Sequence, residues 1–343
     1  MKVTQASEDR WRADAYSVVP IPWPDFSVAD PRGMRLTIRP FAAWYADITV
    51  IGGDWLPINS NGEVLIDHMI HTPWRCLQRL QAQSGSGELS VELGDLLSCD
   101  TPAVLLGGSA NYYHWFIDYL PRIMLLGHER IQSLRIIVQS ELTAFQLDSL
   151  ALLGIDQSKL FRVATQQAVR VKALLLSNLL ASTTVVHPRL PRLMRTLLCE
   201  PDRAQQGQRK IFLSRRDASR RRLINEADLL EVLAKWGFEV HVPGEMSLQA
   251  QMTLCAQASV ICAVHGAALV NMVFAPPGCQ VVEIACTEYR VSSMKILAKM
   301  CGHTYVSLNA DVAVPSEDGN PLLADWVMSD LDKAELELRR CLG

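Results

Sequence analysis

Five of the eight successive positions from residue 215 to residue 222 of this chain are arginines. They lie in the sequence SRRDASRRRLINEAD (residues 214–228), directly after the apolar run KIFLS, and they are Arg215, Arg216, Arg220, Arg221 and Arg222. A guanidinium group can hold the oxygens of a phosphate in a bidentate manner. The segment therefore suits a diphosphate, with Ser214, Arg215 and Arg216 nearest the apolar run. A solvated basic loop is the alternative, and the lack of aromatic residues among the arginines disfavours stacking on nucleic-acid bases.

A glycine turn follows a second apolar run. The sequence HGAALVN (residues 265–271) comes directly after SVICAV. Gly266 would let the backbone approach a ligand, and a helix beginning there would direct N–H groups and the positive end of its dipole at an anion. His265 could add a hydrogen bond or a positive charge beside a phosphate, with Ala267 and Asn271 along the helix. A tight connection without a ligand is the alternative.

One carboxylate interrupts an otherwise apolar run. Glu283 lies within CQVVEIA. It could accept hydrogen bonds from ribose hydroxyls, as acidic residues do in other nucleotide-binding folds. The alternatives are a partly exposed strand residue and an ion pair with an arginine.

A fourth group of polar residues begins at a glycine turn in the first half of the chain. The sequence GGSANYYHWFIDYLPR spans residues 107–122. Gly107 and Gly108 predict the turn, and Ser109 or Asn111 can cap the helix that follows.

Within that helix, His114 and Asp118 stand four residues apart and so share one face. Such a pair beside a cleft could remove the proton from a hydroxyl group. A structural pair beside Trp115 and Pro121 is the alternative.

Motifs of several other enzyme classes are absent from the sequence. There is no GxGxxG after an apolar run, no Walker loop, no GxSxG and no HExxH. The DxD at Asp330-Leu331-Asp332 lies in a predicted amphipathic helix, a poor place to hold a metal-bound diphosphate in a cleft. We therefore expect no metal and no cofactor.

The second half of the chain supplies a scaffold for the first three groups. KIFLS, FEVHVP, SVICAV, CQVVEIA and TYVSLN read as strands, and helical segments separate them. This alternation predicts a parallel sheet with helices on both faces, in which ligands bind outside the carboxyl ends of the strands. The arginine segment and the glycine turn at residue 266 should then lie close together and bind one diphosphate.

The first half is more mixed. Between residues 35 and 67, RLTIRP, DITVI and EVLID alternate apolar and polar residues around the turn NSNG, which predicts a small sheet after an extended arm at residues 1–33. Strands in TPAVLLGG, LRIIVQS and VRVKALLLSNLL then alternate with helices. We place a boundary near residues 205–208. This predicts an N-terminal α/β domain at 1–205, a nucleotide-binding domain at 206–320 and a C-terminal helix at 321–343.

Length and composition agree with two α/β domains. The chain has 343 residues, 49% of them hydrophobic and 20% charged. A net charge of −3 gives no overall attraction to nucleic acid or to anionic lipid.

Nine scattered cysteines, an odd number with no CxxC spacing, predict reduced thiols and neither a disulfide framework nor a zinc cluster. The start MKVTQASEDRWRADAY is polar where a signal peptide would need an apolar segment, so we expect neither secretion nor membrane insertion. We expect a cytoplasmic protein, with peripheral attachment at the inner face of the membrane as an alternative.

Taken together, NYYHWFIDYLPR, IFLSRRDASRRRLINE and HGAALVNMVFAPPGCQVVEI resemble the successive motifs of glycosyltransferase family 61, over residues 105–285. The resemblance implies a GT-B-like α/β fold, with two Rossmann-like domains facing each other across a cleft. It further implies an inverting, metal-independent transfer from a nucleotide donor such as a UDP-sugar.

The resemblance also implies roles for residues. It directs Arg215, Arg216, His265, Gly266 and Ala267 toward the diphosphate and Glu283 toward the ribose. His114 and Asp118 would face the acceptor, with Gly108, Ser109 and Asn111 on the acceptor side. Family members often carry a second glycine where this chain has Ala268.

The chain is similar to bacterial members associated with capsular or other surface polysaccharides. That likeness implies a hexosyl- or pentosyltransferase with a glycan or lipid-linked acceptor. A non-catalytic nucleotide- or glycan-binding subunit of a polysaccharide assembly complex is the second hypothesis. A nucleic-acid-binding module is the third, and the mild acidity of the chain disfavours it.

Overall fold

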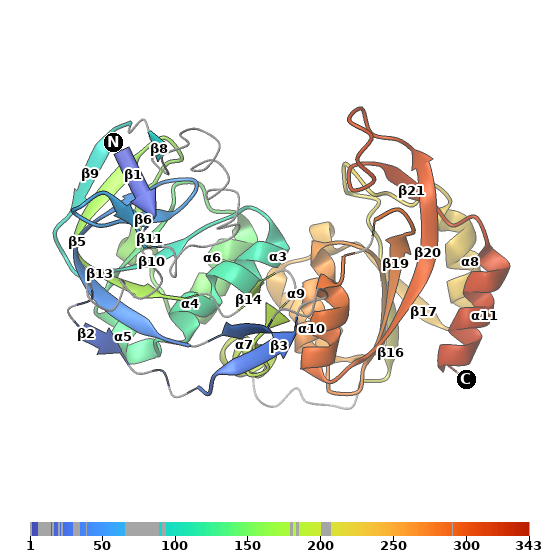
Figure 1. Cartoon of the computed structure of the whole chain (residues 1–343). Coiled ribbons are helices and arrows are strands. Elements are labelled where there is room, and N and C mark those ends of the chain that lie inside the picture. The colour runs from blue at the N-terminus through green and yellow to red at the C-terminus, as the bar shows by residue number, and fades with distance from the viewer. Residues whose placement is uncertain are drawn as a thin grey trace. The chain divides into compact units, whose positions relative to one another are not determined.

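The computed structural model describes residues 2–5, 15, 17–19, 21, 23–29, 35–38, 40–65, 89–90, 94–178, 181–182, 185–199, 207–289 and 291–342. Contacts divide the chain into two compact units, Met1–His187 and Pro188–Gly343. Each unit combines a sheet with helices (Figure 1), so the predicted α/β class is confirmed. Of the boundary predicted at residues 205–208, residues 205 and 206 lie outside the described residues, and the boundary stays a prediction.

One large mixed sheet forms the centre of the first unit. Its eleven strands among the described residues are β1 (Lys2–Gln5), β2 (Ser17–Val19), β5 (Ala42–Ile51), β6 (Leu56–Ile58), β7 (Glu63–Val64), β8 (Leu89–Ser90), β9 (Leu96–Cys99), β10 (Ala103–Gly107), β11 (Arg135–Gln139), β12 (Leu160–Val163) and β13 (Ala168–Ser177). Strands β10, β11, β12 and β13 are parallel, in the order β12-β11-β10-β13. Strand β5 is antiparallel to β13.

The small sheet expected at residues 35–67 is not separate. DITVI lies in β5 and the first two residues of EVLID form β7; both strands belong to the large sheet, in which β5 pairs along its whole length with β13. The first four residues of RLTIRP instead form β4 (Arg35–Ile38), paired with β3 (Phe26–Ala29). A second two-stranded pair joins β14 (Ala181–Ser182) and β15 (Val185–Val186).

The helix predicted after Gly108 is divided into three pieces. They are α3 (Tyr112–His114), the π-helical turn η2 (Trp115–Tyr119) and α4 (Pro121–Met124). In the wide turn, Leu120 N donates to Trp115 O at 2.8 Å. Pro121 follows directly and has no N–H to continue the regular ladder. The other helices of this unit are α5 (His128–Gln132), α6 (Ala144–Leu152) and the 3₁₀ turn η3 (Gln157–Lys159).

The second unit has the predicted alternation of strands and helices. Its sheet has the order β17-β16-β18-β19-β20-β21 and is parallel except for the last pair. The strands are β16 (Arg209–Leu213), β17 (Phe238–His241), β18 (Ala258–Val264), β19 (Gln280–Cys286), β20 (Thr304–Val314) and β21 (Asp325–Val327). The helices are α7 (Leu190–Leu198), α8 (Glu226–Lys235), η5 (Pro243–Glu245), α9 (Leu248–Ala256), η6 (Ala267–Phe274), α10 (Ser293–Cys301) and α11 (Leu331–Leu342).

Two details differ from the sequence prediction. The helix after Gly266, η6, is a 3₁₀ helix. The segment at 321–343 contains strand β21 before helix α11, since β21 pairs with the end of β20.

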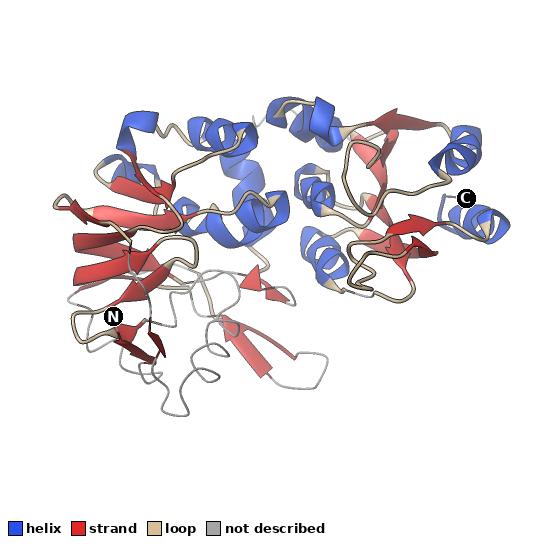
Figure 2. Cartoon of the chain, turned by 90° about the horizontal axis from the view of Figure 1, so that it is seen from above, coloured by secondary structure: helices blue, strands red, loops and turns tan. Residues whose placement is uncertain are grey.

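Helices cover both faces of this second sheet (Figure 2). On one face, Phe212, Cys262, Ile284 and Leu308 form a core cluster with buried residues of α8 and α11. Successive side chains of a strand point to opposite faces, so Glu283 points away from that cluster. Helices α7, α9 and α10 all contact η6.

Among the parallel strands of each unit, the strand order reverses at one strand. In the second unit β16 lies between β17 and β18, and in the first unit β10 lies between β11 and β13. Loops that leave neighbouring parallel strands at such a point border a crevice in doubly wound sheets. The arginine segment, the turn at Gly266 and the turn at Gly108 all begin at these strand ends.

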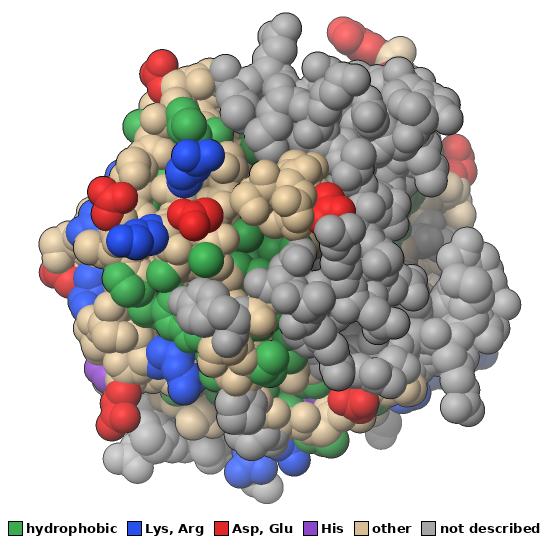
Figure 3. Space-filling model, turned by 60° about the vertical axis from the view of Figure 1, so that its left-hand side comes forward, with side chains coloured by type: hydrophobic (Ala, Val, Ile, Leu, Met, Phe, Trp, Pro, Cys, Tyr) green, Lys and Arg blue, Asp and Glu red, His purple; other side chains and the backbone are tan. Residues whose placement is uncertain are grey.

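No helix among the described residues is both long and apolar enough to cross a membrane. Lys and Arg side chains are interspersed with Asp and Glu on the face that Figure 3 presents, with apolar side chains between them.

A buried histidine makes the stability of the second unit depend on pH. His303 Nε2 donates to Met272 O at 2.8 Å, and Nδ1 has no hydrogen-bond partner among the described residues. Burial lowers the pKa of His303 below 6.5, the bond to Met272 raises it, and the charge of Arg195 lowers it. The unfolded chain then binds the proton more tightly than the folded chain does.

We therefore expect the free energy of unfolding to be highest above pH of about 6.5 and to fall as the pH drops below that value. His303→Gln, whose amide can donate to Met272, should show a weaker fall in urea titrations between pH 7.5 and 5. His128→Gln, at an exposed histidine, should keep the parent's slope. An equal slope in His303→Gln would contradict the assignment.

Candidate active site

The turns that end β16 and β18 meet in the second unit. A Cβ atom built on Gly266 would lie 2.0 Å from Nη1 of Arg215, so the guanidinium group packs directly on the glycine backbone. Gly266 has extended backbone angles, with φ 179°, so the position demands glycine for space and not for conformation. The predicted proximity of the arginine segment and the glycine turn is confirmed.

Two guanidinium groups share this place. Burial and, to a smaller extent, the charge of Arg221 lower the pKa of Arg215 to about 10, against a raising effect of Asp217. Burial also lowers the pKa of Arg221. Nε of Arg215 and Nε of Arg221 are both buried and lack hydrogen-bond partners among the described residues. Neighbouring cations with unsatisfied N–H groups are unfavourable in the interior, and a bound anion would relieve both problems.

Two other arginines of the segment, Arg216 and Arg222, have carboxylate partners. Arg216 is exposed, with Nη2 3.7 Å from Oε2 of Glu245. Arg222 donates from Nε and Nη2 to Asp325 at 3.0 Å and 2.6 Å. The backbone carbonyl of Arg220 accepts from Arg215 Nη2 at 3.2 Å. The structure thus brings Arg215 to the turn at Gly266 and leaves Arg216 beside an exposed carboxylate.

Ser214 shapes the start of the segment. Its buried hydroxyl donates to Glu226 Oε1 at 2.6 Å and accepts from Arg216 N at 3.2 Å. Asn225 directly precedes α8, but its side chain does not cap the helix: it bonds both the carbonyl and the N–H of Met328, each at 3.0 Å. A partner 103 residues away has replaced the local cap.

A buried carboxylate holds His265. Glu283 is only 1% exposed, and its oxygens bond His265 Nδ1 and the hydroxyl of Tyr305. Neither an exposed strand residue nor an arginine partner, the two alternatives for Glu283, describes this arrangement. Because the carboxylate accepts at Nδ1, the other imidazole nitrogen, Nε2, is the one directed to further partners.

Two tyrosines border this pair. Burial raises the pKa of Tyr305, and the negative charge of Glu283 raises it further. The ring of Tyr289 lies edge-on to His265, with centroids 6.1 Å apart.

The remaining residues of the turn play different parts. Ala267 is half-buried and opens η6. Asn271 is buried and donates to Gln251 Oε1 at 2.9 Å, and the Gln251 amide donates to the carbonyls of Pro243 and Met246. Asn271 therefore connects η6 to α9 and the turn before it.

In the first unit, the turn after β10 has the predicted glycines and cap. Gly107 has φ 79°, in the left-handed region that favours glycine, and the Gly108 carbonyl accepts from Trp55 Nε1 at 3.0 Å. Asn111 Oδ1 accepts from the N–H groups of Tyr113 and His114 at 2.9 Å and 3.3 Å. Asn111 is therefore the cap, and Ser109 Oγ accepts from Asn111 N at 3.2 Å.

His114 and Asp118 form the predicted pair. His114 Nδ1 lies 2.7 Å from Asp118 Oδ2, and the side chains are 23% and 7% exposed. Buried Arg122 lies near them: burial lowers its pKa to about 9, although the charges of Tyr119 and Asp118 oppose that shift. A buried carboxylate thus orients a more exposed imidazole, which is the arrangement of a positioned proton acceptor.

Three residues of these groups were missing from the sequence-based site. They are Arg221, Tyr289 and Tyr305. The alternation of TYVSLN would put Tyr305 on one face with Ser307, and the observed register pairs Ser307 with Glu283. No local signal separates Arg221 from its neighbours.

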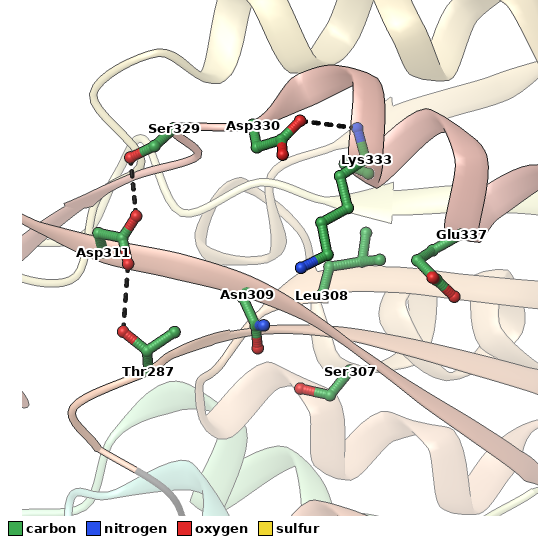
Figure 4. A pocket seen from close by; sticks show the side chains of 10 residues that line it. Thr287, Ser307, Leu308, Asn309, Asp311, Ser329, Asp330, Lys333 and Glu337 are labelled. Atoms are coloured by element: carbon green, nitrogen blue, oxygen red, sulfur yellow. Dashed lines mark hydrogen bonds between the residues drawn. The ribbon is translucent and has the colours of Figure 1, made fainter.

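A polar pocket of about 360 Å³ lies between β20 and α11 (Figure 4). Asp311 accepts there from Thr287 Oγ1 at 3.1 Å and from Ser329 Oγ at 2.8 Å. Asp330 and Glu337 also line it, together with Lys333. This largely acidic lining is a poor match for a diphosphate. In the described part of the chain, no three His, Cys, Asp or Glu side chains are grouped to hold a metal ion.

The comparisons with known proteins agree with the position of these groups. The family model described as Glycosyltransferase 61 matches residues 112–282. The match includes the His114–Asp118 pair, the arginine segment and the turn at Gly266, and it ends one residue before Glu283. None of the curated proteins compared with the chain matches it.

Gly266→Ala should displace Arg215, because the added methyl group needs the space of its guanidinium group. We expect the affinity for pyrophosphate, measured by isothermal titration calorimetry, to fall about tenfold or more, because one charge-assisted hydrogen bond would be lost. The melting temperature should stay within a few degrees of the parent's. Ala268→Gly, a one-methyl change in the same helix, is the control. A folded Gly266→Ala protein with parental affinity would exclude this contact from anion binding.

Proposed function

We propose a function on the premise that the chain carries a glycosyltransferase family 61 domain and is a glycosyltransferase. It transfers a sugar from a nucleotide donor to a hydroxyl group of a glycan or lipid-linked acceptor. One observation carries the donor half of this proposal. The half-buried guanidinium group of Arg215 packs on Gly266 at the point where the strand order reverses, with Arg221 beside it. This concentration of partly buried positive charge fits the diphosphate of a donor such as a UDP-sugar.

We assign His265 to the departing diphosphate. Negative charge grows on that group as the bond to the sugar breaks, and donors already aimed at it stabilise the transition state. Glu283 fixes the imidazole, and Tyr305 in turn fixes Glu283. Glu283 is only 1% exposed and already bonds His265 and Tyr305, so the positioning of His265 is the role that the geometry favours.

We assign proton removal from the acceptor to the first unit. His114 is the more exposed partner and Asp118 is buried behind it. The imidazole would therefore take the proton from the acceptor hydroxyl, while the carboxylate holds the ring and stabilises the imidazolium. The hydroxyl oxygen then attacks the anomeric carbon, and the bond to the diphosphate breaks on the opposite side.

Such a single displacement inverts the configuration at the anomeric carbon. Arg215, His265 and the N–H groups at the start of η6 can hold the leaving diphosphate, so the proposal needs neither a metal nor a cofactor. The GT-B-like arrangement, a bacterial role in surface or capsular polysaccharide synthesis and a cytoplasmic location follow from the family resemblance and the sequence, and they remain part of the proposal.

The donor half is tested by a thermal-shift screen against a panel of nucleotide sugars and nucleoside diphosphates, because a ligand that binds only the folded state raises the melting temperature. For the best ligand, Arg215→Ala should weaken binding about tenfold to 100-fold, as expected for a charged hydrogen-bonding group. Arg216→Ala should have a smaller effect, since Arg216 is exposed beside Glu245. Equal affinity of Arg215→Ala and the parent would remove Arg215 from the donor site.

The acceptor half is tested by comparing two variants of the first unit. Asp118→Asn and His114→Gln should each lower the transfer rate about 10²- to 10⁴-fold, since each disrupts proton removal, while donor affinity stays at the parental value. If the imidazole is the base, His114→Gln loses at least as much rate as Asp118→Asn. A His114→Gln protein that keeps most of its activity while Asp118→Asn loses it would make Asp118 the base. Parental rates in both variants would refute the assignment.

A further inference from the structure

Arg221 has an unusual backbone for its residue type. Its φ is 57°, in the left-handed region, where side chains with a Cβ atom are disfavoured and glycine or asparagine fits best. Such a residue persists only where the surrounding structure holds it.

The neighbouring chain does hold it. Arg221 N donates to Ala324 O at 3.1 Å, Trp326 N donates to Arg222 O at 2.9 Å, and Ile224 N donates to Trp326 O at 2.9 Å. Leu223 and Trp326 form a parallel β-bridge, and Trp326 is fully buried. Residues 221–224 therefore run beside residues 324–326 in a fixed position. This explains how the conformation at residue 221 is kept, and it does not explain why the side chain is an arginine.

The side chain adds a second cost. Its Nε is buried without a hydrogen-bond partner among the described residues, and its charge acts on Arg215 and Tyr289. Arg209, Arg216 and Arg222 in the same unit each have a carboxylate partner. At Arg221 the fold holds a cation next to another cation, beside the turn that carries His265 and Gly266.

We propose that Arg221 is a phosphate-binding residue, and that its left-handed backbone directs a second guanidinium group, beside that of Arg215, onto the diphosphate of the donor. This rests on the proposed function, since it takes a nucleoside diphosphate as the ligand. A diphosphate offers oxygens on two phosphorus atoms, which two planar guanidinium groups can share bidentately. Arg221 is then a determinant of diphosphate binding that the arginine-rich sequence does not single out.

The test uses a substitution that suits the backbone and removes the charge. Arg221→Asn fits the left-handed conformation, so its melting temperature should equal or exceed the parent's. Its affinity for UDP and for pyrophosphate, measured by isothermal titration calorimetry, should fall about tenfold or more. Asp47→Asn, at a left-handed position of the first unit, is the matched control and should bind both ligands as the parent does.

The outcomes separate this inference from the proposed function. If the parent binds neither pyrophosphate nor any nucleoside diphosphate, the proposed function fails and the inference fails with it. If the parent binds and folded Arg221→Asn binds equally well, the inference alone is overturned. If Arg221→Asn does not fold, Arg221→Lys is the test variant, because it keeps the positive charge and lacks the planar guanidinium group that binds phosphate in a bidentate manner. Weaker binding by a folded Arg221→Lys supports the inference, and parental binding overturns it.

Discussion

The site of the second unit depends on two half-buried arginines whose positive charges lie close together. Arg215 and Arg221 lie together, each with a buried Nε that lacks a partner among the described residues. The guanidinium group of Arg215 packs on the turn at Gly266, and the backbone at Arg221 is held by the segment at 324–326. The missing methyl group at residue 266 and the left-handed backbone at residue 221 are the local consequences of this one constraint.

The two units use the same device for different chemistry. In each, a carboxylate fixes an imidazole through Nδ1: Asp118 holds His114, and Glu283 holds His265. The first pair spans one wide helical turn and leaves the imidazole partly exposed, which suits exchange of a proton with a substrate. The second pair links a strand to the turn beside two arginines, and Tyr305 locks its carboxylate. That setting suits a fixed imidazole next to an anion.

The sequence predicts the parts of the site that depend on local periodicity. Alternating strands and helices imply a parallel sheet, and the carboxyl ends of β16 and β18 then share an edge, which brings Arg215 to Gly266. The parts that depend on distant contacts were not predictable. Asn225 bonds Met328 instead of capping α8, and Arg221 owes its backbone to Ala324. Neither partner can be identified from spacing, because each lies 103 residues along the chain.

The distribution of unfavourable features within the second unit supports a ligand at this point. Strain at Arg221 and unsatisfied guanidinium groups each lower the stability of the free protein, and they occur within a few residues of one another. Elsewhere in the unit, arginines such as Arg209 and Arg222 have carboxylate partners. A fold that satisfies these arginines could have done the same at residue 215, where Asp217 is close enough to raise the pKa. Nε of Arg215 still has no hydrogen-bond partner among the described residues, as is expected of a group that binds a ligand.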